Sequence, residues 1–258
     1  MNFVKKVLDE MDHCYAVGNI VFDGRRYLLY AAENDGPCYA YDEETKEKIV
    51  VWEHPGGTMS MIPIPGTNGE FLAVQGFRTG FMAQNTSLAW VVPKKDGPWE
   101  VTTVLKHPFI HRFDILTVGD TNYLLICTLA TSKENKDDWS DPGKLWVGVL
   151  PRDLKKEPIQ ISILTEGMLK NHGYCRVNWD GKMAGLTTCA QGLFLVIPPQ
   201  APGKDWTVEK LIDRPISDVA AVDIDGDGEL ELATIEPFHG NELCTSRSTA
   251  STCLWADG

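Results

Sequence analysis

The sequence lacks several features that would place it in a common class. No run approaches the roughly 18 apolar residues that a transmembrane helix needs, and the first residues hold no apolar stretch of the roughly 7–15 residues typical of a secretory signal. Basic residues are few: 24 Lys and Arg stand against 36 Asp and Glu, for a net charge of −12. An acidic surface repels phosphate backbones and anionic lipids. We therefore expect a cytoplasmic protein that binds neither nucleic acid nor a membrane.

Cysteine pairs and common catalytic motifs are also missing. The seven Cys are an odd number, and none of them has CxxC spacing. This usage predicts reduced cysteines rather than a disulfide framework. The sequence contains no GxSxG, Walker loop, GxGxxG or HExxH. Function therefore has to be inferred from repeats and from the placement of single residues.

A repeated unit is the clearest pattern that is present. Residues 99–109 align without a gap with residues 206–216, and Trp, Val and Pro recur at the same offsets. A weaker copy at 48–55 ends on the same Pro. Each copy is followed by an apolar strand, a Gly-containing turn and a second strand, as in 113–127. Only 2–11 and 153–156 are expected to be helical.

A unit of four short strands that recurs in this way is typical of a β-propeller blade. We therefore predict an all-β protein, a β-propeller of four-stranded blades that forms a single domain over 1–258. The last segment, 244–258, is rich in Ser and Thr and breaks the pattern. We expect the last of about five repeats to be incomplete, with an open edge that a partner protein would close. The expected units are 12–53, 54–106, 107–165, 166–214 and 215–258.

An acidic loop lies between the two strands of the last unit. Asp223, Asp225, Asp227 and Glu231 alternate with residues that include two glycines. Closely spaced carboxylates form an oxygen cage that suits a hard cation, and without a cation they repel one another. We expect a structural Ca²⁺ here. The alternative is an Asp/Gly-rich turn without an ion.

Residues 219–233 resemble the FG-GAP/VCBS-type repeat, whose blades carry a D-x-D-G-D-G-x-x-D/E loop. More weakly, 236–241 and the histidine-bearing units are similar to the propeller domain of aldos-2-ulose dehydratases. The first resemblance implies a β-propeller with a calcium loop. The second implies that the propeller carries out dehydration of a sugar.

Three histidines occupy comparable places in the repeat. His111 and His172 each precede the aromatic start of an inner strand by two residues, and His239 follows the second strand of the last unit. In an antiparallel blade these connections lie on one face, opposite the Asp/Gly turns. We expect the three to meet at one mouth of the channel, where imidazoles hold a second divalent metal or act as a general base. For His54 and His107 we favour a packing role, and that reading stays open for the other three.

Arg78 follows another second strand and is expected at the same mouth, where its cation would stabilise an enolate or a carboxylate. Together with the dehydratase resemblance, this predicts a carbohydrate lyase or dehydratase that acts on a small sugar or glycan. His172 or His111 would remove a proton next to a carbonyl, and a second imidazole or a cation would stabilise the enolate. The alternative is a non-catalytic FG-GAP/VCBS-type module that binds a protein or a glycan.

Overall fold

The computed structural model describes the backbone of residues 4–201, 203–247 and 250–255. In these residues the chain is all-β, with one short 3-10 helix and five antiparallel sheets. No described helix is long and apolar enough to cross a membrane. The chain divides into two compact units, Met1–His107 and Pro108–Gly258. The single domain over 1–258 therefore stays a prediction.

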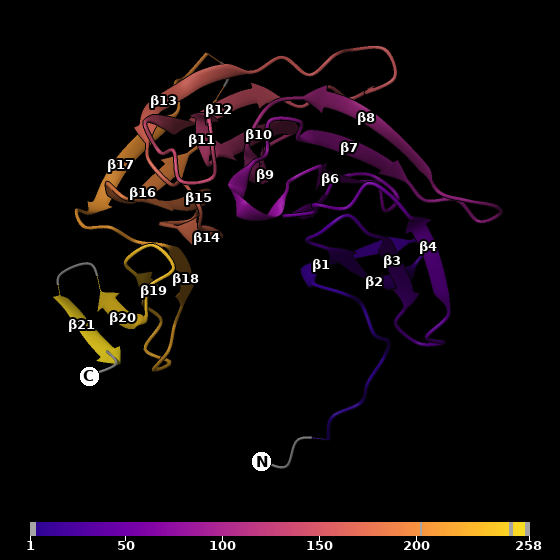
Figure 1. The fold of residues 1–258 in the computed structure, drawn as a ribbon, viewed down its shortest axis with the longest axis horizontal. Coiled ribbons are helices and arrows are strands. Elements are labelled where there is room, and N and C mark those ends of the chain that lie inside the picture. The colour runs from indigo at the N-terminus through magenta and orange to yellow at the C-terminus, as the bar shows by residue number, and fades with distance from the viewer. Residues whose placement is uncertain (1–3, 202, 248–249, 256–258) are drawn as a thin grey trace. The chain divides into compact units, whose positions relative to one another are not determined.

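The unit Met1–His107 holds two four-stranded sheets, in each of which neighbouring strands follow one another along the chain (Figure 1). The first sheet contains β1 (Cys14–Phe22), β2 (Arg25–Ala32), β3 (Cys38–Asp42) and β4 (Lys48–Trp52). The second contains β5 (Met61–Pro63), β6 (Phe71–Gln75), β7 (Ser87–Val92) and β8 (Glu100–Lys106), with the 3-10 helix η1 (Thr79–Phe81) between β6 and β7.

The unit Pro108–Gly258 holds the other three sheets. The first contains β9 (Ile110–Val118), β10 (Thr121–Thr128), β12 (Asp141–Val149) and β13 (Ser162–Met168), with the short β11 (Ala130–Ser132) paired to the start of β12. The second contains β14 (Tyr174–Trp179), β15 (Lys182–Cys189), β16 (Gly192–Ile197) and β17 (Thr207–Ile212). The third contains β18 (Asp218–Val222), β19 (Glu231–Glu236), β20 (Glu242–Arg247) and β21 (Ala250–Trp255).

The turns between first and second strands follow from their sequences. In the first of these turns, φ is +49° at Asp23 and +76° at Gly24. In another, φ is +49° at Asp180 and +75° at Gly181. Two successive residues with positive φ make the type I′ turn, whose twist matches that of paired strands. Each predicted strand–turn–strand segment is confirmed as an antiparallel pair.

The last sheet corrects two expectations. Because β18 to β21 form a four-stranded sheet, the prediction of an incomplete last unit was wrong. The Ser/Thr-rich sequence still forms a strand, because backbone pairing needs no apolar side chains and Thr has a high strand propensity. Cys244 is buried and disulfide-bonded, which contradicts the expectation of reduced cysteines. Cys253 stands opposite it in the strand register, a proximity that spacing along the chain does not reveal.

Both expected helices are also absent. Residues 4–11 have no regular structure, and 153–156 form only a turn. Asp9 instead accepts hydrogen bonds from the Tyr41 hydroxyl and, at 2.7 Å, from Lys48 Nζ. These contacts hold the segment against the first sheet, so tertiary partners outweigh a weak helical preference.

Apolar side chains fill the spaces between consecutive sheets within each unit. One cluster joins the two sheets of Met1–His107, with Ile20, Leu29 and Phe71 among its members. In Pro108–Gly258, one cluster joins the sheet of β9 to that of β14, and another joins the sheet of β14 to that of β18. Consecutive sheets therefore stack face to face, which brings loops of different sheets close together.

A buried carboxylate ties β9 to β14. Asp114 of β9 is 1% exposed and accepts hydrogen bonds from Arg176 Nε and from the Tyr174 hydroxyl, both at 2.9 Å. A second nitrogen of Arg176 also binds this carboxylate. Because Tyr174 and Arg176 both belong to β14, the interaction sets the position of β14 against β9.

We expect Arg176→Met to lower the free energy of unfolding by about 2–3 kcal/mol, since it leaves the Asp114 charge buried with Tyr174 as its remaining side-chain donor. This expected loss is small for a broken ion pair with a buried carboxylate, because the Arg176 side chain is 43% exposed. Arg25→Met is the matched control. Asp42, the partner of Arg25, also accepts two backbone N–H bonds, so the expected loss there is below about 1 kcal/mol. Urea unfolding measures both, and equal losses would contradict the role given to Asp114.

Candidate functional site

The three predicted histidines come together within the unit Pro108–Gly258. His111 is the second residue of β9, His172 lies two residues before β14, and His239 lies in the loop after β19. The ring centres of His111 and His172 are 4.4 Å apart, and those of His172 and His239 are 4.8 Å apart. His172 Nε2 and His239 Nε2 are separated by 3.2 Å. The predicted convergence of these three side chains is therefore present in the structure.

Backbone carbonyls fix the tautomers of the two buried rings. His111 Nδ1 donates to the carbonyl oxygen of His172 at 3.0 Å, and His172 Nδ1 donates to that of Ser217 at 3.3 Å. A neutral imidazole with its proton on Nδ1 carries a lone pair on Nε2. In His172 this lone pair faces His239 Nε2, which then carries a proton in a hydrogen bond between the two rings.

Burial keeps both inner rings neutral. His111 is 2% exposed and His172 is 8% exposed. Burial, and then the nearby charge of Arg112, lower the pKa of His111 well below its usual value. The same causes, in the same order, lower the pKa of His172 to about 3. A ring of such low basicity suits a hydrogen-bond acceptor or a metal ligand better than a general base near neutral pH.

His239 differs from the other two because it is exposed. Its φ of +50° is unusual for a residue other than glycine, and Phe238 stacks on its ring with 4.3 Å between the centres. The loop is built so that His239 reaches both the solvent and His172. Of the three histidines, it is the one that a substrate can reach.

Aromatic and basic residues outside the predicted site extend the cluster; of these, the sequence marks only Trp139, as an exposed residue of a polar loop. The Phe238 ring lies 5.5 Å from His172 and 5.8 Å from Trp139. The ammonium of Lys133 lies 3.3 Å from the centre of the Trp139 ring, and that of Lys170 lies 4.7 Å from the Phe238 ring. Proximity of Lys170 to His172 along the chain is the one signal that pointed to it.

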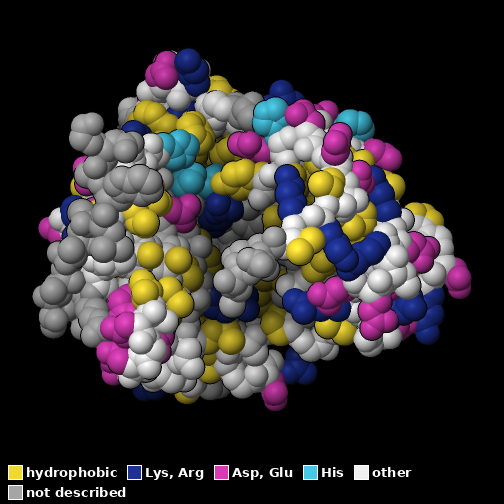
Figure 2. Space-filling view, turned by 90° about the horizontal axis from the view of Figure 1, so that it is seen from below, with side chains coloured by type: hydrophobic (Ala, Val, Ile, Leu, Met, Phe, Trp, Pro, Cys, Tyr) yellow, Lys and Arg dark blue, Asp and Glu magenta, His cyan; other side chains and the backbone are white. Residues whose placement is uncertain are grey.

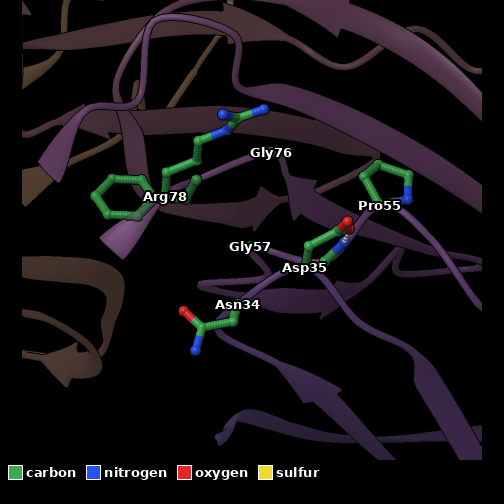
Figure 3. A pocket seen from close by; sticks show the side chains of 8 residues that line it. Asn34, Asp35, Pro55, Gly57, Gly76 and Arg78 are labelled. Atoms are coloured by element: carbon green, nitrogen blue, oxygen red, sulfur yellow. Dashed lines mark hydrogen bonds between the residues drawn. The ribbon is translucent and has the colours of Figure 1, made fainter. Parts of the chain in front are cut away.

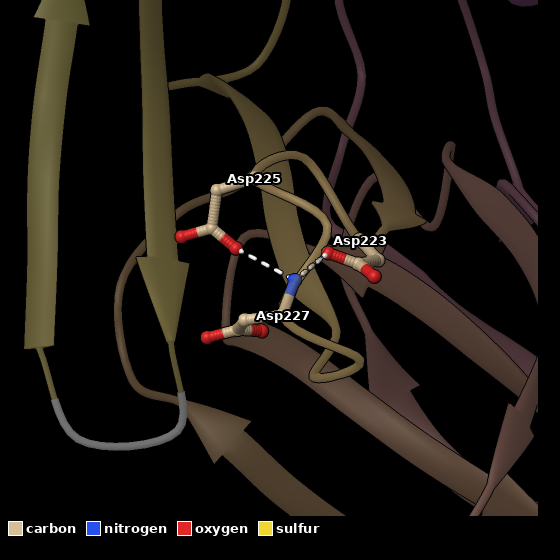
Figure 4. Close-up of side chains that lie close together, drawn as sticks. All are labelled: Asp223, Asp225 and Asp227. Atoms are coloured by element: carbon tan, nitrogen blue, oxygen red, sulfur yellow. Dashed lines mark hydrogen bonds between the residues drawn. The ribbon is translucent and has the colours of Figure 1, made fainter.

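The acidic loop brings three of its four predicted ligands together (Figure 4). One carboxylate oxygen each of Asp223, Asp225 and Asp227 lies within 4.8 Å of the others. Glu231 is not part of this group; it is buried and accepts a 2.7 Å hydrogen bond from the backbone N–H of Ile224.

Backbone N–H groups also bind these carboxylates. Asp223 accepts from Gly226, Asp227 and Gly228, at 2.7 to 3.1 Å, and Asp225 accepts from Asp227 at 3.3 Å. Such bonds hold the turn in shape without an ion. Carboxylate oxygens keep further lone pairs, so the same turn is also a possible oxygen cage.

Arg78 lies in the unit Met1–His107 and lines a cavity of about 500 Å³ there (Figure 3). Its charge helps to lower the pKa of Asp35, after the N–H of Gly56 and the ring of His54, which bind that carboxylate. The structure thus groups Arg78 with Asn34 and Asp35, and its predicted role beside the histidines stays a prediction. The other lining residues are Pro55, Gly56, Gly57, Gly76 and Phe77.

Neither His54 nor His107 adds to the cluster of three. His54 is exposed and lies 3.2 Å from Asp35, and His107 is half-buried. Backbone bonds to Thr86 hold His107, and burial lowers the pKa of its ring. Half-burial of His107 is compatible with the packing role that the sequence favours, whereas His54 is exposed, and the role of each stays a prediction.

Comparison with known proteins gives a fold likeness only. No family model and no curated protein match the chain. Hydrazine synthase from Kuenenia stuttgartiensis matches with a TM-score of 0.52 and 11% identity, covering 89% of this chain and 70% of the other. Cobalt-substituted Synechocystis ACO, an apocarotenoid oxygenase, matches with a TM-score of 0.57 and 13% identity, covering 94% of this chain and 61% of the other. At such identity the likeness concerns the fold and not the activity.

The low pKa of His172 predicts acid destabilisation. An unfolded histidine titrates near 6.5, so below that pH the unfolded chain binds more protons than the folded one, and stability falls toward pH 3. In buffer with EDTA, the free energy of unfolding of the parent chain falls between pH 6.5 and pH 5. We expect this fall to be about 2 kcal/mol smaller in His172→Asn. His54→Asn, at an exposed site, should keep the parental slope. Melting temperatures across this range measure the effect, and three parallel slopes would contradict it.

Proposed function

We propose that the protein is a carbohydrate lyase or dehydratase built on a β-propeller. The observation that carries the proposal is the contact of His172 with His239 at 3.2 Å, backed by the His111 ring. Three different sheets supply these residues, His111 from the start of β9 and the other two from loops, and convergence of groups from separate repeats is a common way to build a site on a rigid frame. The ligand would be a small sugar or a glycan.

The propeller supports this site as its frame. Five antiparallel sheets, each with four main strands in chain order, have the form expected of blades, and the matching solved structures include propeller-like proteins. Under this proposal His111, His172 and His239 occupy the ends of blades that face one mouth. The Asp223 loop lies beyond the opposite end of β18 and β19 from His239, as the sequence reasoning expected.

The histidine pair suggests how a proton would move. With the Nε2 proton of His239 directed to His172, the lone pair of His239 is on Nδ1, where it takes up a proton from the carbon next to a carbonyl. The electron pair forms a carbon–carbon double bond, and the neighbouring carbon–oxygen bond breaks. The leaving oxygen takes a proton from water and departs as water or an alcohol. His172 orients the base, and His111 packs against His172.

The same geometry would also hold a divalent metal ion. Two imidazole nitrogens bound at about 2.0–2.1 Å to one ion are separated by about 3.0–3.4 Å, which includes the 3.2 Å seen here. Neutral rings with fixed Nδ1 protons are suited to metal binding. Such an ion would stabilise the developing enolate.

A non-catalytic module that binds a glycan or a protein is the second candidate. The cavity beside Arg78 favours it, because the polar residues Asn34, Asp35 and Arg78 line it together with the apolar residues Pro55 and Phe77. Small-molecule sites often combine these features. Under this reading the histidines only pack.

We expect His239→Gln to lower kcat for elimination at least about 100-fold, because it removes the base. Product formation is followed by the ultraviolet absorbance of the new unsaturated carbonyl. His54→Gln, at an exposed site in the unit Met1–His107, is the control and should keep full activity. Equal rates for both variants, or no product from any acidic or neutral sugar, would favour the binding module.

Elemental analysis of the purified chain distinguishes the two forms of the proposed site. A transition metal that is present in the parent chain and lost in His111→Ala/His172→Ala would place an ion between the rings. If elimination activity persists without such an ion, the active form of the site is the hydrogen-bonded pair of His172 and His239.

For the acidic loop, we propose a structural Ca²⁺ bound by Asp223, Asp225 and Asp227. A saturating ion at about 100 times its Kd stabilises the folded state by about 2.7 kcal/mol. We expect EDTA to lower the melting temperature of the parent chain, calcium to restore it, and Asp225→Asn to abolish the response. Asp225 is the suitable target since it accepts only one long backbone bond among those described above. Asp180→Asn, in a turn with a single Asp, should respond like the parent. An unchanged melting temperature in EDTA would show that backbone bonds alone hold the turn.

A further inference from the structure

A basic and aromatic surface adjoins the histidines, and we name it the Lys170 surface. It consists of Lys170, Trp139 and Phe238. The Lys170 ammonium lies 4.7 Å from the Phe238 ring centre and 5.2 Å from that of Trp139. The two rings meet edge to face at 5.8 Å. All three side chains are partly exposed, so a ligand can reach them.

The Lys170 charge is available to a ligand. Among the described residues, no carboxylate lies within ion-pair distance of its ammonium, whose contacts are the two rings. The backbone of Lys170 has a φ of +55°, a conformation that a residue other than glycine adopts at some cost.

Charges of both signs lie nearby. Lys133 lies 3.3 Å from the centre of the Trp139 ring, and Arg112 lies close enough to lower the pKa of His111 and His172. The acidic groups are Asp137 and Asp138 beside Lys133, and Asp218, 3.8 Å from His172 Nδ1. On the face seen in Figure 2, basic and acidic side chains are interspersed.

Phe238 joins this surface to the proposed site. Its ring centre lies 5.5 Å from that of His172 and stacks on that of His239 at 4.3 Å, and Lys170 and Trp139 are further neighbours. The Lys170 ammonium and the exposed imidazole of His239 therefore both lie next to the same aromatic ring.

We propose that the substrate is an acidic sugar, with its carboxylate on Lys170 and its ring beside Trp139 and Phe238. The location rests on the proposed function. An ammonium binds a carboxylate by a charge-assisted hydrogen bond.

This substrate class also suits the chemistry. In a uronate, the carbon next to the carboxylate loses its proton to His239, and the electron pair forms the double bond to the neighbouring carbon. The bond from that carbon to the leaving oxygen breaks, and water protonates the oxygen. The intermediate places a second negative charge on the carboxylate, so the Lys170 cation binds it more tightly than it binds the ground state.

The test is calorimetric titration of the whole chain with D-glucuronate and with D-glucose. We expect glucuronate to bind at least about 10-fold more tightly than glucose, and Lys170→Met to remove this preference while leaving glucose affinity unchanged. Lys170→Arg should keep the preference, and Trp139→Ala should weaken both sugars. Lys210→Met is the matched control, since Lys210 also lies over an aromatic ring, 5.5 Å from that of Phe194, but pairs with Asp213.

Because the titration measures binding without turnover, it tests the acidic-sugar site independently of the proposed lyase activity. Unchanged glucuronate affinity in Lys170→Met, or no binding of glucuronate by the parent chain, overturns the acidic-sugar site. A glucuronate preference that depends on Lys170, with no elimination by any variant, supports the acidic-sugar site and contradicts the lyase. Elimination from neutral sugars without a preference for glucuronate supports the lyase and contradicts the acidic-sugar site.

Discussion

The candidate site depends on the packing of β14 against β9, and one buried ion pair sets it. Asp114 carries its charge into the space between two sheets, where Arg176 and Tyr174 neutralise and hydrogen-bond it. A buried charge tolerates little displacement from its partners, because the low dielectric makes separation costly. His111 lies three residues before Asp114 and His172 four residues before Arg176, so the pair also fixes the two inner rings against each other.

Hydrogen bonds between the histidines and the backbone add a second constraint. The carbonyl of His172 holds the His111 ring, and the carbonyl of Ser217 holds the His172 ring. Each loop thereby positions the side chain of the preceding one, from β9 to β14 to β18. Of the three rings, His111 and His172 are buried and His239 is exposed.

Much of this arrangement could be predicted from residues and spacing. The Asp-Gly turns at 23–24 and 180–181 have positive φ at both residues and join paired strands, which is why these two hairpins could be placed from their sequences. Matched positions in successive repeats also brought His111, His172 and His239 together. Errors arose where the pattern was weak. The Ser/Thr-rich end of the chain forms a strand through backbone pairing, which leaves little trace in hydrophobicity.

The sequence by itself determined the strand content, the turns and the acidic loop, because backbone conformation at Gly and Asp and the alternation of apolar residues are local properties. Tertiary structure decided what surrounds the histidines. Lys170, Trp139 and Phe238 come from separate loops, and no local pattern distinguishes them from ordinary surface residues. The low pKa of His172 likewise exists only after the sheets have packed and excluded water from its ring. Contacts between distant segments and the desolvation that they cause are not encoded at any single position.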